Sequence, residues 1–235
     1  MIKSFIVLVI PMIMAAPQKI SQQQVDFKVT EALRLPRVLA AQNLIEVKSE
    51  ASKMLKEMTF NEKWPMKTRW KAFMIFMKLQ GENGLVVAEK AYNHSTWFMR
   101  SAAITAMTEV NPAKAKLWAY KSLIKDPALM VRMKALDVLK DSRNSKVRKL
   151  LWSQLHAPIN KRGKKSLWIR ADIARELTKN PMPNESRKWV RLLYESDKEL
   201  QLIATQALNR LNPKLSHGGS DISFWREQFP KTKSL

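Results

Sequence analysis

Residues 126–139 read DPALMVRMKALDVL, and weaker copies of this stretch recur on both sides of it. Asp126 suits a capping position and Pro127 suits the first position of a helix. Residues three or four apart form one face, namely Leu129, Arg132, Ala135, Leu136 and Leu139. This is the period of an α-helix, so the stretch predicts one helix that buries this face.

The copies keep the arginine at the centre of the pattern, at Arg69, Arg100, Arg132 and Arg170. These arginines are 31, 32 and 38 residues apart, and a looser copy follows at residues 203–207. A second register repeats with them, because Trp118, Trp152 and Trp189 each come shortly after a basic residue, 34 and then 37 residues apart. A repeat of this length is typical of a solenoid built from helix pairs.

The two registers resemble the HEAT repeat family over residues 60–211, and the form Asp-Pro-x-x-x-Val-Arg-x-x-Ala-x-x-x-Leu is typical of its bilin-lyase-like branch. The resemblance implies an all-α fold, a right-handed α-solenoid of about five helix pairs with N- and C-terminal capping helices. It implies that Asp126, Arg100, Arg132 and Arg170 bridge neighbouring repeats. It also implies a protein-binding scaffold, and it does not imply an enzyme.

The chain divides into four parts on this basis. We expect a signal peptide at 1–15, a lead-in and capping helix at 16–59, the repeat array at 60–211 and a C-terminal cap at 212–235. Residues 20–35 are expected to be an extended lead-in that becomes helical, and 37–58 a single capping helix. The other expected helices are 65–79, 85–92, 96–107, 112–124, 126–139, 145–155, 165–177, 184–194, 198–211 and 221–229.

The N-terminus has the layout of a secretory signal, with Lys3, an apolar run over 5–14 and the small pair Ala15-Ala16. A spanning helix needs about 20 apolar residues, which this run lacks. We therefore expect a periplasmic or secreted protein, cleaved within a residue or so of Ala15. The alternative is an inner-membrane protein anchored by residues 5–16, and membrane contact is expected only through this segment when it is uncleaved.

The charge is strongly positive, with 42 Lys and Arg against 20 Asp and Glu, a net charge of +22. Residues 112–170 hold sixteen Lys and Arg against three Asp. Such an excess favours an anionic partner, whether nucleic acid, anionic lipid, an acidic envelope polymer or an acidic protein surface. The alternative is a charge that only keeps the protein soluble. Basic residues gather on a first helix, on the loop 158–164 and on a second helix, at Lys146, Arg148, Lys149, Lys161, Arg162, Lys164, Lys165 and Lys134.

Nothing in the sequence predicts catalysis, a metal site or a cofactor. Cysteine is absent, and His94, His156 and His217 stand far apart with no second ligand at helical spacing. No phosphate-binding loop or nucleophile elbow is present.

The tryptophans divide into two groups. Regular repetition predicts that Trp118, Trp152 and Trp189 pack in the core, whereas Trp97 and Trp168 lie near the start of second helices and are candidates for a ligand surface. We therefore predict an exported scaffold that binds a protein or an anionic envelope partner through a concave face and a basic edge. The candidate partner-binding residues are Trp97, Arg132, Lys134, Lys161, Arg162, Lys164, Lys165, Trp168 and Arg170.

Two other interpretations stay open. One is a nucleic-acid-binding protein similar to the HEAT-like alkylpurine DNA glycosylases, whose pairing of aromatic residues with a concave aspartate has no counterpart that we can assign here. The other is a bilin or haem lyase-like accessory protein, for which the sequence offers no cofactor ligand.

Overall fold

The computed structural model describes residues 20–140 and 143–230. Within these residues the protein is all-α, as predicted, with thirteen α-helices and one short two-stranded hairpin. Among the described helices, none has both the length and the hydropathy that crossing a bilayer requires. The predicted signal segment, residues 1–15, and the alternative anchor, residues 5–16, lie outside the described part of the chain.

The helices follow one another with short connections. They are α1 (Gln22–Ala32), α2 (Arg37–Asn43), α3 (Lys48–Phe60), α4 (Met66–Gln80), α5 (Leu85–Tyr92), α6 (Trp97–Val110), α7 (Pro112–Lys125), α8 (Leu129–Val138), α9 (Ser145–His156), α10 (Ile169–Thr178), α11 (Ser186–Leu193), α12 (Lys198–Leu211) and α13 (Ile222–Gln228). Strands β1 (Lys161–Arg162) and β2 (Lys165–Ser166) form the hairpin between α9 and α10.

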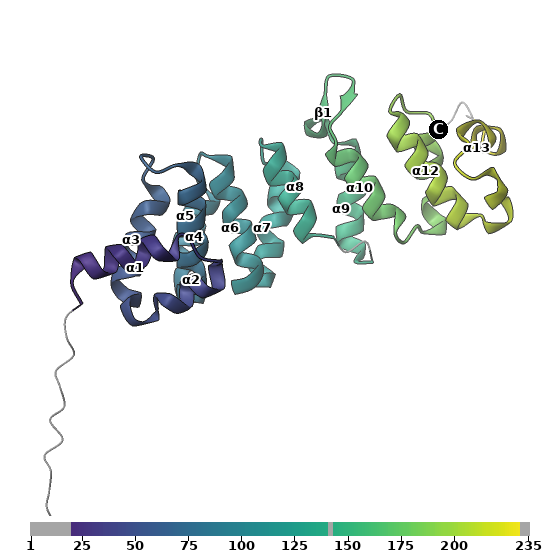
Figure 1. Ribbon diagram of the computed structural model, residues 1–235. Helices are drawn as coiled ribbons and strands as arrows, with labels where there is room; N and C mark the ends of the chain where they lie inside the picture. The colour runs from purple at the N-terminus through teal and green to yellow at the C-terminus, as the bar shows by residue number, and fades with distance from the viewer. Residues whose placement is uncertain (1–19, 141–142, 231–235) are drawn as a thin grey trace, which may run out of the picture.

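The helices form an elongated row, with α1 to α3 at one end and α13 at the other (Figure 1). Consecutive helices pack on each other, α3 on α4, α5 on α6, α7 on α8, α9 on α10 and α11 on α12. We call the earlier member of each couple the first helix and the later member the second helix. The second helices also contact one another in chain order, from α4 through α6, α8 and α10 to α12.

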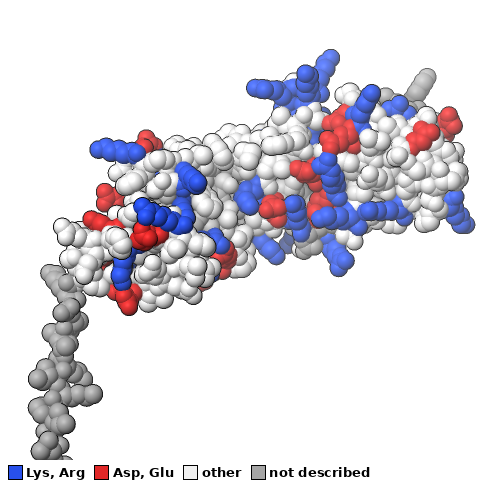
Figure 2. Space-filling view, viewed as in Figure 1, with Lys and Arg blue, Asp and Glu red and all other residues white. Residues whose placement is uncertain are grey.

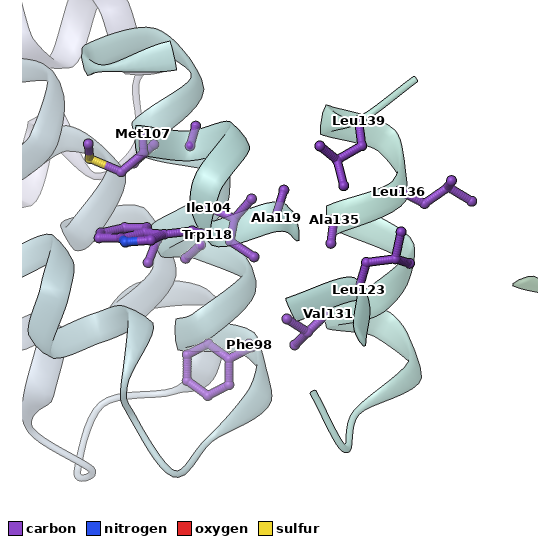
Figure 3. Close-up of a cluster of buried hydrophobic side chains, with 14 of the residues drawn as sticks. Phe98, Ile104, Met107, Trp118, Ala119, Leu123, Val131, Ala135, Leu136 and Leu139 are labelled. Atoms are coloured by element: carbon purple, nitrogen blue, oxygen red, sulfur yellow. The ribbon is translucent and has the colours of Figure 1, made fainter. Parts of the chain in front are cut away.

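The core runs between the helices along the whole row, and Figure 3 shows the part between α6, α7 and α8. Val131 and Ala135 point from α8 toward α6 and α7, whereas Leu136, which is also buried, points to the other side of α8. A second helix is therefore apolar on two sides, because it packs on its own first helix and on the second helices beside it.

The N-terminal region differs from the prediction in two places. Residues 22–32 form a regular helix, whose start is fixed by a capping box between Ser21 and Gln24. The predicted single helix at 37–58 is two helices, α2 and α3, joined by a 3-10 turn at Ile45–Val47. Leu44 and Val47 are both fully buried at this turn, so packing bends the chain where the sequence contains neither glycine nor proline.

Two second helices begin later than predicted. Asp126 does not cap α8: it ends α7, and its carboxylate accepts a hydrogen bond from the Ala128 N–H at 2.9 Å while it pairs with Arg100. Helix α8 therefore begins at Leu129. Helix α10 begins at Ile169 and not at Lys165, because residues 165–166 form strand β2.

The C-terminal helix agrees with the prediction, since α13 spans Ile222–Gln228 within the expected range of 221–229. Asp221 caps it through the N–H groups of Ser223 and Phe224. Trp225 is fully buried, and the helix contacts both α11 and α12.

Candidate functional site

The repeated arginines fold back onto the loop that precedes their own helix. Arg132 Nη1 donates to the carbonyl oxygens of Asp126 and Pro127, at 2.7 and 3.0 Å. Likewise, Arg100 Nη1 donates to the carbonyl oxygens of His94 and Ser95 in the preceding loop, at 2.9 and 2.7 Å. A guanidinium donates strong, charge-assisted hydrogen bonds, so each arginine fixes the turn between the two helices of its own couple.

The same arginines also reach the next couple along the row. Arg100 binds the Asp126 carboxylate with two parallel hydrogen bonds, at 2.7 and 2.8 Å. Arg132 Nε donates to Oδ1 of Asn160 at 3.0 Å, in the turn that follows α9. These contacts agree with the bridging role that the HEAT resemblance implies for the motif residues.

Burial removes two of the candidate residues from the partner surface. Arg132 is 2% exposed and Arg170 is 1% exposed. The Arg170 guanidinium donates hydrogen bonds to the Leu155 carbonyl at 2.6 Å and to the Glu195 carboxylate at 2.7 and 2.9 Å. Both arginines are used inside the protein, so neither offers a charge to a partner, contrary to their place among the candidates.

The predicted basic loop is an ordered β-hairpin that projects from the edge of the row (Figure 1). Lys161 pairs with Ser166 and Arg162 with Lys165 in antiparallel register, which leaves Gly163 and Lys164 in the turn. Gly163 has a φ of +60° and no described residue other than glycine has a positive φ, which indicates a type II′ turn with glycine at its first central position. We call residues 161–166 the basic hairpin.

The base of the basic hairpin is fixed in the protein. Asn160 is fully buried, donates to the Gln154 carbonyl at 2.8 Å and accepts from Arg132, so it connects α9 to the preceding couple. The Leu167 N–H donates to the Asn160 carbonyl at 3.0 Å and closes the hairpin. Arg162, Lys164 and Lys165 are exposed, and Lys161 is half-buried. Their cationic groups gather at the top of the molecule in Figure 2.

Exposed apolar side chains lie at the N-terminal ends of three second helices, α6, α8 and α10. Trp168, which is 59% exposed, lies between the basic hairpin and α10, and Trp97, which is 40% exposed, is the first residue of α6. Met130, on the first turn of α8 between them in the row, is also exposed. Sequence reasoning missed Met130, although it occupies the same position relative to Arg132 as Trp168 does relative to Arg170.

The surface of the second helices is not a basic surface. A groove of about 270 Å³ lies along α6, α8 and α10, and Lys134, Lys140, Asp137 and Asp172 are among the residues that line it. Lys134 and Lys140 both donate to the Asp137 carboxylate, at 3.3 and 2.7 Å, and these hydrogen bonds, with that of Lys140 the stronger, lower the pKa of Asp137. Lys134 is half-buried and paired with Asp137, whereas Arg162, Lys164 and Lys165 of the basic hairpin are exposed.

Trp118, Trp152 and Trp189 are core residues, as predicted. Trp118 stacks on Tyr92 at a ring separation of 4.5 Å, and Trp152 meets Trp189 edge to face at 4.7 Å. The contacts join the first helices of neighbouring couples, which explains why tryptophan recurs at the repeat period.

The described residues hold no group of three or more His, Asp or Glu side chains arranged to bind a metal ion. Burial lowers the pKa of His94, and it lowers the pKa of His156 against the opposing effect of Glu195. A lowered pKa favours the neutral form of both rings. The positive charge of the edge therefore comes from lysine and arginine.

The chain matches no protein-family model and no curated protein.

Proposed function

We propose that the protein is a HEAT-like, right-handed α-solenoid of five helix pairs that works as a binding scaffold without catalytic chemistry. The packing of consecutive helices in couples supports this architecture. So do the contacts of Arg100, Arg132 and Arg170, each of which joins its own loop to the loop of the next couple. In this proposal α1, α2 and α13 cover the ends of the stack, which a solenoid needs because a terminal repeat otherwise exposes an apolar face.

The proposed partner is anionic, an acidic protein surface or an acidic envelope polymer, and it binds at the edge formed by the basic hairpin and Trp168. One observation carries this proposal: an ordered hairpin, fixed at its base by the buried Asn160, presents three exposed cations beside an exposed tryptophan. A charge that only kept the protein soluble would need neither a rigid mount nor an adjacent aromatic ring. Tryptophan supplies a large contact area with little loss of conformational entropy, which suits it to a binding surface.

Nucleic acid is the second candidate partner, and Trp168 is the observation that favours it. Single strands are held by cationic grooves with aromatic rings on which bases stack, and such binding weakens steeply with salt. The basic hairpin offers the cations and Trp168 offers an aromatic ring, although it is a single exposed ring where such proteins have several.

The first test removes the three exposed charges of the hairpin. We expect Arg162→Gln, Lys164→Gln and Lys165→Gln together to weaken binding to heparin and to polyglutamate by about tenfold at low salt, as for the loss of three exposed ionic contacts. Trp168→Ala is expected to weaken binding as well, with an unchanged salt dependence. Titration calorimetry at two salt concentrations measures both effects.

A matched control separates the hairpin from net charge alone. Lys53, Lys56 and Lys63 are exposed, lie at the other end of the row and are in no ion pair within residues 20–140 and 143–230. Their replacement by glutamine removes the same charge and is expected to change binding little. Equal weakening by the two triple variants contradicts a specific edge, and stacking of a single-stranded oligonucleotide on Trp168 in preference to polyglutamate favours nucleic acid.

We also propose that the chain is exported and cleaved near Ala15, because Lys3, the apolar run 5–14 and the small pair that follows have the layout of a secretory signal. Expression of the full chain with a C-terminal tag in a Gram-negative host is expected to give a periplasmic product that begins near Ala16. Mass spectrometry of the N-terminus measures this. An intact Met1 in the membrane fraction indicates the anchored alternative, and an intact Met1 in the cytosol overturns export.

A further inference from the structure

The first helices of the C-terminal half contain no acidic residue. Helix α7 reads PAKAKLWAYKSLIK, α9 reads SKVRKLLWSQLH and α11 reads SRKWVRLL. The second helices of the same couples differ, since α8 contains Asp137, α10 contains Asp172 and Glu176, and α12 contains Glu199. In these three couples the helical acidic residues are thus confined to the second helices.

Most cations of α7 and α9 are exposed. The exposed ones are Lys116, Lys121 and Lys125 on α7 and Lys146 and Lys149 on α9. Lys114 is half-buried and paired with Glu89, and Arg148 is buried. None of the five exposed lysines is in an ion pair within the described residues. The nearby carboxylates are already engaged, Asp126 by Arg100 and Glu185 by Arg148. The layer therefore presents a positive charge that no ion pair within residues 20–140 and 143–230 neutralises.

Helix α11 continues this layer. Arg187, Lys188 and Arg191 are exposed on it, and Lys188 Nζ lies 5.1 Å from the centre of the Trp152 ring on α9. The Trp152 and Trp189 rings hold α9 and α11 side by side. We call the outward surface of α7, α9 and α11 the first-helix face.

Helix α7 adds an apolar stripe to the first-helix face. Leu117, Tyr120 and Ile124 are 52%, 41% and 41% exposed, and their spacing of three and four residues places them above one another on one side of the helix. The inward side of α7 is filled by other residues, including Trp118 and Leu123, so the core does not need the stripe. Exposed apolar residues that form a contiguous patch mark an interaction surface.

We propose that the first-helix face docks on an anionic lipid surface, with the stripe of α7 inserted between headgroups. A helix that lies on a membrane has apolar side chains toward the acyl boundary and lysines or arginines beside them, and the stripe flanked by Lys116, Lys121 and Lys125 has this composition. The lysines of α9 and the cations of α11 extend the contact with phosphate groups. A nucleic acid would use the same charges but would give Leu117 and Ile124 no role.

This surface is distinct from the basic hairpin, which lies in the loop between α9 and α10, so the two proposals stand or fall separately. It also extends the expected membrane contact beyond the N-terminal segment. The full chain retains its own apolar segment at 5–14, so a test of bulk vesicle binding would not isolate α7. A local probe on α7 does isolate it.

The chain contains no cysteine, which makes a single introduced cysteine a unique labelling site. We expect a polarity-sensitive fluorophore on Leu117→Cys to shift to an apolar environment when vesicles of phosphatidylglycerol and phosphatidylcholine are added, and to stay unchanged with phosphatidylcholine alone. Leu202, which is 42% exposed on the second helix α12, is the matched control. The same fluorophore on Leu202→Cys is expected to stay in water.

A second variant tests the charges of the face. With Lys116→Gln, Lys121→Gln and Lys125→Gln added, we expect the shift at residue 117 to need about a hundredfold more anionic lipid, because each lysine near such a surface contributes about fivefold. Lys53→Gln, Lys56→Gln and Lys63→Gln are the control for net charge. An unchanged fluorophore at residue 117, an equal shift at residue 202, or an equal shift with duplex DNA in place of vesicles overturns the proposal.

Discussion

Glu185→Leu lowers the free energy of unfolding by about 3 to 5 kcal/mol, the expected result of removing one partner from a buried ion pair. Glu185 is 6% exposed and Arg148 is 3% exposed. The carboxylate accepts from Arg148 Nε at 2.6 Å and from Trp152 Nε1 at 2.7 Å, and it also accepts from Arg148 Nη2. The substitution removes the carboxylate that pairs with this buried guanidinium and leaves the Trp152 N–H without its acceptor.

The double variant Arg148→Met with Glu185→Leu separates the cost of a buried charge from the cost of lost packing. Replacement of a whole buried pair by apolar residues is often neutral, so we expect the double variant to recover at least half of the loss, with the Trp152 N–H still lacking its acceptor. Urea denaturation followed by far-UV circular dichroism measures both variants. A loss below about 1 kcal/mol in Glu185→Leu, as for an exposed pair, contradicts the result.

Arg148 also shows where sequence reasoning about charge fails. In the sequence it lies between Lys146 and Lys149 and reads as part of one basic cluster. In the structure the two lysines are exposed and Arg148 is buried, because its counter-ion arrives 37 residues later in the chain. Helical periodicity gives the face of the helix on which a residue lies. Whether that face is buried, and whether its charge is neutralised, depends on which distant segment packs against it.

The repeat arginines also show that residue type alone does not give burial. Their recurrence correctly located the second helices, since α4, α6, α8 and α10 each contain one near the N-terminus. Burial makes Arg132 and Arg170 structural, and a pattern of residue types alone does not distinguish a buried arginine that binds carbonyl groups from an exposed one. The implied bridging role of the motif was therefore a better guide than the local excess of charge.

Short and irregular elements were the least predictable from the sequence. The two-residue strands of the basic hairpin are too short for any periodicity, and the sequence predicted only a loop over 158–164. The break between α2 and α3 is caused by the burial of Leu44 and Val47, without a breaking residue. In contrast, the long periodic helices α6, α7 and α12 lie within a few residues of the expected ranges.

Five of the candidates are exposed in the structure, namely Trp97, Arg162, Lys164, Lys165 and Trp168. The acid-free first-helix face was not foreseen, because it is visible only after the helices are sorted into layers. The count of sixteen basic residues in 112–170 included Arg132, Arg148 and Arg170, which are buried, and left out the cations of α11. Sorting by layer therefore changes which charges act together.

Arg132→Met has the second large expected effect, and it tests how the row is held together. The guanidinium donates hydrogen bonds to four acceptors. Two are the carbonyl oxygens of Asp126 and Pro127 in its own loop, and two are the Ile159 carbonyl oxygen and the Asn160 side chain in the turn after α9. Methionine keeps much of the apolar packing but donates nothing. At about 1 kcal/mol for each acceptor, we expect a loss of about 4 kcal/mol in the free energy of unfolding.

The position of Arg132 predicts more than a loss of stability. Repeat proteins are stabilised by contacts between neighbouring repeats, and unfolding divides where such a contact is weak. Arg132 connects α8 to the turn after α9, so its loss is expected to separate the unfolding of α1–α8 from that of α9–α13. Hydrogen exchange measured along a urea series locates the two transitions.

Arg175→Ala, which removes an exposed arginine from α10 and its pairs with Asp172 and Glu199, is the control and is expected to cost less than about 1 kcal/mol. A single transition in Arg132→Met, with a loss no larger than in this control, means that apolar packing between the couples holds the row together without the arginine bridge.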